Sequence, residues 1–426
     1  MSHRHILITT LCLVCLKIPS PLMGSYFELK PEILITNIYD DNILLENQKN
    51  KADNILTLSP SINLNHKTYN NQVFFSYFPT FVKYFKYSNY NTIRHNAKID
   101  LNHHISKYLW FDIKEVYLKS EEAYEPDQLN PNIRHSGKSY QRNAAYLGLN
   151  YQFGQEDLAM IEYNHNILDN NDENLDNALE QGPTCTLSYW FDIRNGFSLS
   201  FQLLDNRFNR QNRSPIGDDF KSYNSSLRYT HRFDKYSKTY ADYKISDRIF
   251  KGQTPDYSVH NFFLGLDYAI SANSTLSTGT GYYNQQIETS KDTKGILFEA
   301  NITTKKDNIT INVGAKKGWD ESFISAESKG FTKYSSISTN IQYQISDKFN
   351  SYGKASYREN QGTDDLVDQT YEGSIGFNIE FFDWYTFSLD YTYRTRKSDL
   401  KESEYNDNRI MLNFSASKSF KDLLTN

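Results

Sequence analysis

The 426-residue chain has few cysteines and no long apolar run. Of its three cysteines, Cys12 and Cys15 lie in a short N-terminal apolar segment, so Cys185 is alone in the rest of the chain. This excludes a disulfide framework and a cysteine-rich metal site. Cys185 shares its strand parity with apolar neighbours, and we expect a lipid-facing or packed thiol. Because no apolar run approaches about 18 residues, the sequence predicts no transmembrane helix.

The chain is also poor in aliphatic residues and rich in aromatic ones. Hydrophobic residues make up 38%, aromatic residues make up 15%, and the mean hydropathy is -0.68. A large dry core would need more aliphatic side chains, and a disordered chain would have fewer aromatic ones. A transmembrane β-barrel satisfies both observations, because its outside is apolar and its inside is polar and wet. The net charge of -5 and the lack of a basic patch argue against a nucleic-acid partner.

The N-terminus has the pattern of a signal peptide. His3, Arg4 and His5 precede an apolar run of about eleven residues, which is too short to cross a bilayer. We predict a signal peptide over residues 1–24, a barrel over residues 25–420 and a short C-terminal tail over residues 421–426. A short membrane anchor is the alternative.

The strongest pattern in the chain is the stretch Tyr371–Arg396. Alternate residues from Tyr371 to Phe381 are apolar or Gly, and the residues between them are polar or Gly. After a break at Phe382–Trp384 the alternation resumes from Tyr385 to Tyr393. Side chains alternate between the faces of a strand, so this stretch predicts an amphipathic β-hairpin with one aromatic face and one charged face.

Similar hairpins recur along the chain, joined alternately by short and long connections. Polar turn residues predict short turns near Lys67–Asn71, Ile105–Tyr108, Gly154–Asp157, Asp192–Asn195, Asp234–Ser237, Ser271–Ser274, Lys306–Asn308, Ser346–Lys348 and Phe382–Trp384. Longer polar connections are predicted at Asp40–Asp53, Ser120–Ser139, Asp169–Gly182, Arg207–Phe220 and Gly318–Thr332. Outer-membrane barrels have this asymmetry, with short periplasmic turns and longer extracellular loops.

The predicted fold is therefore all-β, a transmembrane antiparallel up-and-down β-barrel of about 18–20 strands. Strands of about ten to thirteen residues exceed the soluble average and suit a membrane. A soluble sandwich or a propeller is the alternative. Trp110, Trp190 and Trp384 lie beside short turns and Trp319 begins a long connection, which is typical of interfacial aromatic belts, although Trp110 and Trp190 fall on the less apolar parity.

The stretch Ile38–Leu64 resembles the opening hairpin of the β-barrel porin-2 family. The resemblance rests on a strand ending in Tyr-Asp-Asp-Asn, a polar loop, an Asp and a strand containing Leu-Ser-Pro. The matching residues are Tyr39, Asp40, Asp41, Asn42, Asp53, Leu58, Ser59 and Pro60. Members of this family are outer-membrane proteins that often accompany genes for extracellular polysaccharide production. The resemblance implies a barrel in the cell outer membrane and a conduit for polysaccharide, and it supplies no catalytic residues.

The last predicted strand ends in an aromatic residue, Phe420. It resembles the closing strand that the barrel-assembly machinery recognises in outer-membrane proteins. The tail KDLLTN after Phe420 departs from that pattern. The expected partners are outer-membrane lipid, the assembly machinery and polysaccharide or its export apparatus.

No catalytic or metal motif is present, so we expect no enzyme activity, no cofactor and no metal. The chain contains no GxSxG, HExxH or P-loop. His103 and His104 are adjacent on a strand and point to opposite faces, so they do not readily share a metal. The acidic run Asp169–Asp176 could supply oxygen ligands to calcium but lacks the EF-hand spacing, and a solvated loop is the favoured interpretation.

The polar parity of the strands predicts the lining of a pore. The candidate pore-lining residues are Asp267, Glu372, Glu380, Asp390 and Arg394. Mixed charges on a pore wall tune selectivity, and acid–base pairing inside the barrel is the alternative role. A barrel of this size is too wide for its own side chains to fill. Ser120–Ser139 is the best candidate for an inward-folded constriction, and a position on the surface is the equal alternative.

These patterns predict a porin-like outer-membrane barrel that passes hydrophilic solutes or exported polysaccharide through a polar lumen. Two alternatives stay open. One is a non-transporting surface barrel whose long extracellular loops bind a partner. The other is an outer-membrane hydrolase built on a cluster of Asp, His or Ser at one rim.

Overall fold

The computed structural model describes residues 25–48, 50–124, 134, 137–209, 218–288, 291–324, 330–362 and 364–421. The predicted signal peptide, residues 1–24, lies outside the described residues, as do residues 422–426 of the predicted tail. The part of the chain that the structure describes contains no helix long and apolar enough to cross a membrane.

Within the described residues, twenty long strands and one two-residue strand form a single sheet. The strands are β1 (Tyr26–Asp40), β2 (Asp53–Lys67), β3 (Asn71–Tyr84), β4 (Thr92–His104), β5 (Leu109–Ser120), β6 (Tyr140–Gln152), β7 (Leu158–Asn170), β8 (Asn177–Trp190), β9 (Asn195–Asn209), β10 (Phe220–Arg232), β11 (Ser237–Phe250), β12 (Tyr257–Ser271), β13 (Ser274–Ile287), β14 (Thr293–Lys306), β15 (Ile309–Ser322), β16 (Gly330–Ser346), β17 (Phe349–Gln361), β18 (Val367–Phe381), β19 (Tyr385–Ser398), β20 (Tyr405–Ser417) and β21 (Phe420–Lys421).

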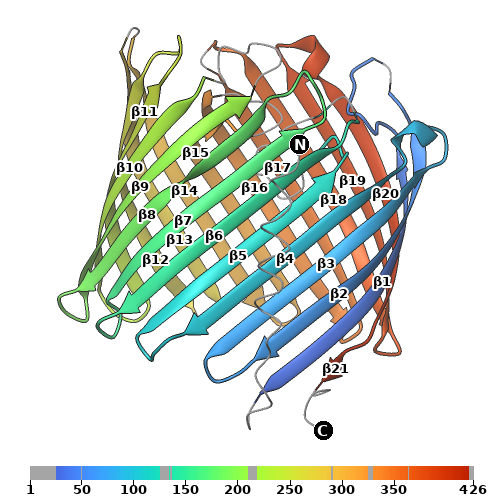
Figure 1. Cartoon of the computed structure of the whole chain (residues 1–426), viewed down its shortest axis with the longest axis horizontal. Coiled ribbons are helices and arrows are strands. Elements are labelled where there is room, and N and C mark those ends of the chain that lie inside the picture. Colours follow the sequence, from blue (N-terminus) through green and yellow to red (C-terminus); the bar gives the residue numbers. More distant parts are fainter. Residues whose placement is uncertain are drawn as a thin grey trace.

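The sheet closes into a barrel (Figure 1). Each long strand pairs antiparallel with the next, and β1 pairs with β20 from Glu32 opposite Ser417 to Asp40 opposite Arg409. The short strand β21 extends this seam, with Phe420 opposite Leu29. Closure removes free sheet edges from the wall below the level of Phe298, which is what a bilayer requires of a β-structure. The all-β barrel and the predicted strand number are confirmed.

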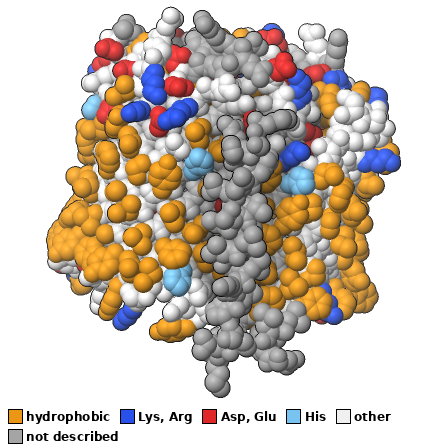
Figure 2. Space-filling view, viewed as in Figure 1, with side chains coloured by type: hydrophobic (Ala, Val, Ile, Leu, Met, Phe, Trp, Pro, Cys, Tyr) orange, Lys and Arg blue, Asp and Glu red, His pale blue; other side chains and the backbone are white. Residues whose placement is uncertain are grey.

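The two faces of the wall differ as the alternation predicts. On the hairpin that showed the pattern best, outward Ile375 is 64% exposed, whereas inward Asp390 is 7% exposed. Figure 2 shows hydrophobic side chains spread over the barrel wall and charged side chains gathered along the upper rim. Cys185 is a free, exposed thiol on the outward face, as expected.

The short turns lie at one end of the barrel and the longer connections at the other (Figure 1). The end with the longer connections is the extracellular end. Two predicted connections are shorter than expected. Asp169–Gly182 is mostly strand, since β8 begins at Asn177, and Gly318–Thr332 is largely a paired hairpin, since β15 continues to Ser322 and β16 begins at Gly330.

The predicted tryptophan belt is wrong for three of the four tryptophans. Trp384 is 48% exposed at a turn. Trp110 and Trp190 lie on the inward face, where Trp110 stacks on His104 and Trp190 stacks against the Arg232 guanidinium. Trp319 packs on Phe331 inside the mouth of the barrel. The face of the strand on which each tryptophan falls, and not its height in the membrane, therefore decides whether its indole meets lipid or the lumen.

Candidate functional site: the lumen and its extracellular mouth

Charged side chains of both signs lie on the inward face at two levels. Lys238 Nζ lies 3.3 Å from Asp267 Oδ2 near the periplasmic end, and Lys316 Nζ lies 2.9 Å from Glu299 Oε1 at mid-height. The side chains of Lys316 and Glu299 are each 45% exposed although they point inward, so this level of the lumen is open to water. Such exposed pairs add little stability, and their main effect is on the potential in the lumen.

The five predicted pore-lining residues all lie on the inward parity. Glu372 on β18 and Arg394 on β19 are direct partners across the strands, with Arg394 Nε 3.1 Å from Glu372 Oε2. Arg394 Nη1 also lies 3.7 Å from Asp407 Oδ2. Asp267 pairs with Lys238 and accepts a hydrogen bond from the Ser277 hydroxyl.

The other two predicted residues differ in exposure. Asp390 is buried, accepts a hydrogen bond from the Tyr352 hydroxyl and accepts another from Asn413 Nδ2 over 3.1 Å. Glu380 is exposed at the periplasmic end of β18. The structure thus joins Glu372 to Arg394 and leaves Asp267 and Glu380 elsewhere on the wall. A pore-lining role for the five residues stays a prediction.

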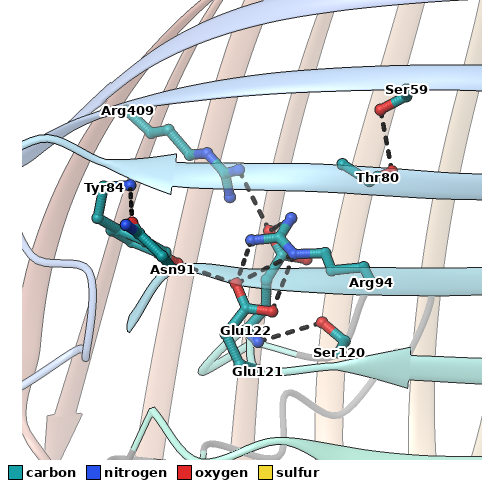
Figure 3. Close-up of polar contacts among 9 residues, drawn as sticks. All are labelled: Ser59, Thr80, Tyr84, Asn91, Arg94, Ser120, Glu121, Glu122 and Arg409. Carbon is teal, nitrogen blue, oxygen red and sulfur yellow. Dashed lines mark hydrogen bonds and ion pairs between the residues drawn. The ribbon is translucent and has the colours of Figure 1, made fainter. Parts of the chain in front are cut away.

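Part of the β5–β6 connection folds into the extracellular mouth, where an inward guanidinium holds it (Figure 3). Arg94 on β4 donates hydrogen bonds to Glu121 over distances of 2.6 to 3.1 Å, and its Nη1 lies 2.9 Å from Glu122 Oε1. Glu121 is 4% exposed and also accepts a hydrogen bond from the Tyr84 hydroxyl. The start of this loop is therefore fixed to β3 and β4 by charge-assisted hydrogen bonds.

A second cation reaches the same loop from the far side of the barrel seam. Arg409 on β20 places Nη2 3.4 Å from Glu122 Oε1, and Figure 3 shows Arg409 and Arg94 on either side of this carboxylate. Burial alone would raise the pKa of Glu122, but the charges of Arg94 and Arg409 outweigh it and lower this pKa below its usual value.

Further contacts continue along the β5–β6 connection. Ala123 packs with Leu45 of the β1–β2 connection and with Tyr405. The guanidinium of Arg134 lies 3.6 Å from the centre of the Tyr140 ring, and Arg134 is 1% exposed. The prediction that Ser120–Ser139 folds inward is confirmed for Glu121–Tyr124 and Arg134, and the rest of that loop, apart from Gly137–Ser139, lies outside the described residues.

The β15–β16 hairpin also reaches into the mouth, although its sequence predicts only a polar connection. β15 pairs with β14 only as far as Lys317 opposite Phe298, yet it stays paired with β16 up to Ser322 opposite Gly330. The tip of this hairpin (residues 318–332, described except 325–329) therefore leaves the wall. Gly330 has a φ of 61°, a left-handed conformation that favours glycine.

The hairpin tip bends inward and binds strands that are not its neighbours. Trp319 Nε1 donates a hydrogen bond to Asn261 Oδ1 on β12 over 2.7 Å. Glu321 accepts from Arg248 on β11 over 2.5 Å and from the Tyr257 hydroxyl over 2.8 Å.

The end of the tip reaches farther across the lumen. The Phe323 ring centre lies 4.6 Å from that of Phe220 on β10. Arg142 on β6 donates to the Ile324 carbonyl over 3.2 Å. The tip therefore spans the inner mouth from β14 towards β6. The sequence signal was the density of aromatic and charged residues in a segment interpreted as a polar loop.

One group of acidic side chains in the described ranges has the spacing of metal ligands. Asp40, Asp41 and Asp407 each offer a carboxylate oxygen, and these oxygens lie within 4.8 Å of one another. The group lies at the extracellular end of the β1–β20 seam and not in the Asp169–Asp176 run, for which a solvated loop is the favoured interpretation. The Asp-Asp pair belongs to the Tyr-Asp-Asp-Asn segment that carried the family resemblance.

His103 and His104 point to opposite faces, as expected. The His103 ring lies beside Phe111 on the outward face, and the His104 ring stacks on Trp110 in the lumen. They do not form a shared site.

Solved structures similar to this chain are outer-membrane barrels. The ferric citrate transporter FecA in its unliganded form matches 93% of this chain and 79% of its own, at 10% identity and a TM-score of 0.55. The siderophore receptor PirA from Pseudomonas aeruginosa matches 94% of this chain and 81% of its own, at 8% identity and a TM-score of 0.53. The outer membrane protein OpdK from Pseudomonas aeruginosa matches 92% and 99%, at 8% identity and a TM-score of 0.46.

No protein-family model matches the sequence, and no curated protein matches it either. The porin-2 resemblance is therefore unconfirmed. At these identities the structural likeness shows the fold alone, which is that of outer-membrane β-barrels. The protein is an outer-membrane β-barrel, and its location is the cell outer membrane.

Proposed function

We propose that the protein is a gated porin-like channel for hydrophilic solutes. The observation that supports this is the contrast between a wet, charged mid-lumen and an extracellular mouth occupied by two inward-folded segments. A barrel of twenty strands encloses more space than its own side chains fill, so the inner segments decide whether a path exists. Asp267, Glu372, Glu380, Asp390 and Arg394 would line this path and tune its selectivity.

Exported polysaccharide is the solute class that we put forward for this channel. The family resemblance of Ile38–Leu64 points to polysaccharide production. A lumen wall with paired charges of both signs suits a long polar polymer, because it offers many weak contacts and no single strong site. The export apparatus would then be the periplasmic partner, and the barrel-assembly machinery would insert the chain.

Conductance in planar bilayers tests the channel. We expect small or rare current steps for the wild-type protein, and larger steps when residues 318–332 are replaced by a short turn. Replacing the connection 362–366 between β17 and β18 is the matched control and should leave the steps unchanged. A folded barrel that conducts in neither form would contradict transport and favour a surface barrel that binds a partner through its loops.

Liposome swelling tests the solute class. Vesicles that contain the hairpin-shortened variant should admit neutral oligosaccharides of increasing length. If entry stops at monosaccharides, the polymer proposal fails while the channel proposal stands.

A further inference from the structure

The three carboxylates at the extracellular end of the seam come from opposite ends of the chain. Asp40 ends β1 and faces Arg409 on β20, which places Asp407 beside the end of β1. Asp41 accepts hydrogen bonds from the Asn408 backbone N over 2.7 Å and from Asn408 Nδ2 over 2.8 Å. Asp40 Oδ1 accepts from the backbone N of Asn42 over 2.8 Å. The backbone pairing of the first and last long strands therefore fixes all three side chains in place.

Asp407 points into this group, and no donor among the residues that the structure describes forms a hydrogen bond with it. It is 1% exposed, and within the described ranges neither of its carboxylate oxygens has a hydrogen-bond partner. Its ion pair with Arg394 spans 3.7 Å, which is beyond hydrogen-bond distance. Burying an ionised carboxylate in this state raises the free energy of the folded protein, because the group has lost its hydration shell and no hydrogen-bond donor replaces it.

The surrounding charges do not neutralise the group. The contacts of this corner link the carboxylates of Asp40, Asp41, Asp407, Glu121, Glu122 and Glu372 to the guanidinium groups of Arg94, Arg394 and Arg409. Among the described residues of this corner, six carboxylates face three guanidinium groups, and this excess of negative charge is largely withdrawn from water. A bound cation or bound protons must compensate part of it.

We propose that Asp40, Asp41 and Asp407 bind one divalent cation, with calcium preferred over magnesium. All three ligands are hard carboxylate oxygens, and carboxylates can bind calcium through one or both oxygens in flexible geometry. Magnesium demands near-octahedral geometry and keeps several waters, which suits a tightly buried carboxylate such as Asp407 less well. Asp407 supplies oxygens that no donor of the described chain occupies, and Asp41 opens the site towards the loops, since it is less buried than the other two.

The cation would join the first and last strands at the rim. Its ligands lie beside Arg409, which also holds Glu122 of the inward-folded β5–β6 connection. Cation binding would therefore stabilise both the barrel seam and one of the segments that occlude the mouth. This role does not depend on the transported solute.

Calcium titration of the intact barrel tests the site. The refolded full chain is held in detergent without lipopolysaccharide, stripped with EDTA, and titrated with CaCl₂ by calorimetry while thermal unfolding is followed in parallel. We expect one calcium per chain with a Kd on the order of 0.1–1 mM, the weak range of extracellular calcium modules, and a higher unfolding midpoint with calcium. Magnesium should bind more weakly.

Two variants and one control make the result specific. Asp407→Asn and Asp41→Asn should each weaken calcium binding by at least about tenfold, since each removes one of three charged ligands. Asp407→Asn should also unfold at a higher temperature than wild type in EDTA and lose the calcium-dependent rise, because it removes the uncompensated charge. The Asp390→Asn variant changes another buried aspartate on the lumen face, and it should bind calcium with the affinity of the wild-type protein.

The proposal is overturned if wild-type protein shows neither heat nor a midpoint shift with calcium. It is also overturned if the midpoint rises only on acidification and not with calcium, since protons rather than a cation would then compensate the carboxylates. Equal calcium affinity in Asp407→Asn, Asp41→Asn and wild type would likewise place any bound ion elsewhere.

Discussion

The indole Nε1 of Trp319 donates a hydrogen bond to Oδ1 of Asn261 over 2.7 Å, although their strands β15 and β12 are not neighbours in the wall. A contact of this kind exists only because the β15–β16 hairpin tip leaves the wall and lies against the inner faces of other strands. In the proposed channel this tip would be the gate, because its displacement would leave the wall pairing below Lys317 intact.

Glu321→Ala should loosen the gate. Glu321 and Arg248 are largely buried, and removing one partner of a buried ion pair costs about 3–5 kcal/mol. We expect larger or more frequent current steps in planar bilayers, and faster protease cleavage within residues 318–332. Glu299→Ala removes an exposed pair with Lys316, worth about 1 kcal/mol or less, and should leave both readouts as in wild type. Similar gating in the two variants would argue against the hairpin as the gate.

Phe377→Arg should hinder membrane folding far more than Asn378→Arg. Phe377 is outward and packs beside Phe349 and Phe387, whereas Asn378 is inward and donates to Asn350. Arg on the lipid face near the midplane costs about 2–4 kcal/mol, and Arg in a wet lumen costs much less. Heat-modifiable gel mobility after refolding into vesicles reports the folded fraction. Equal losses would contradict the assignment of the two faces.

Glu380→Lys should move ion selectivity towards anions. Glu380 lies exposed on the inward parity at the periplasmic end of β18, and a reversed charge there changes the potential that a permeating ion meets. The measurement is the reversal potential under a salt gradient in the hairpin-shortened background, where current is larger. Thr386→Ser, opposite Glu380 on β19, is the neutral control. An unchanged reversal potential would place Glu380 outside the conduction path.

Lowering the pH should weaken the ion pairs that hold the β5–β6 connection against Arg94 and Arg409. The pKa of Glu122 in the folded protein is lowered below its usual value of 4.5, so its contribution to stability is complete above pH 4.5 and is lost as the pH falls through the lower folded value. We expect channel opening to increase as the external pH falls below about 4.5, measured by conductance. In Glu122→Gln the charge is already gone, so the loop should be looser at neutral pH and this acid response should shrink. Glu156→Gln, at a periplasmic turn, should keep the wild-type response.

The wall of this barrel could be predicted from the sequence because its determinants are local. Alternation from Tyr371 to Phe381 fixes which face of β18 meets lipid, and residues such as Asp192–Asn195 form a tight turn through their own hydrogen bonds. Pairing between consecutive strands then follows from the short connections. The inward bend of residues 318–332 depends instead on partners such as Arg248 and Phe220, which lie far away in the sequence.

The candidate site could be predicted only in part. Parity placed Glu372 and Arg394 on the same face, and the hairpin register made them partners. The meeting of Asp40 with Asp407 requires barrel closure between the first and last long strands, and no periodic pattern indicates which residues face each other across that seam. In the sequence, Asp40 and Asp41 stand out only as part of the family motif.

The point where the hairpin leaves the wall also limits where the bilayer can sit. Beyond Phe298 opposite Lys317, the upper part of β14 (residues 293–297) pairs with β13 but not with β15. Backbone N–H and C=O groups on that free edge need water, because each unsatisfied group in hydrocarbon costs several kcal/mol. The hydrocarbon boundary must therefore lie at or below the level of Phe298, with the Lys317 ammonium positioned to meet the polar headgroups of the outer leaflet.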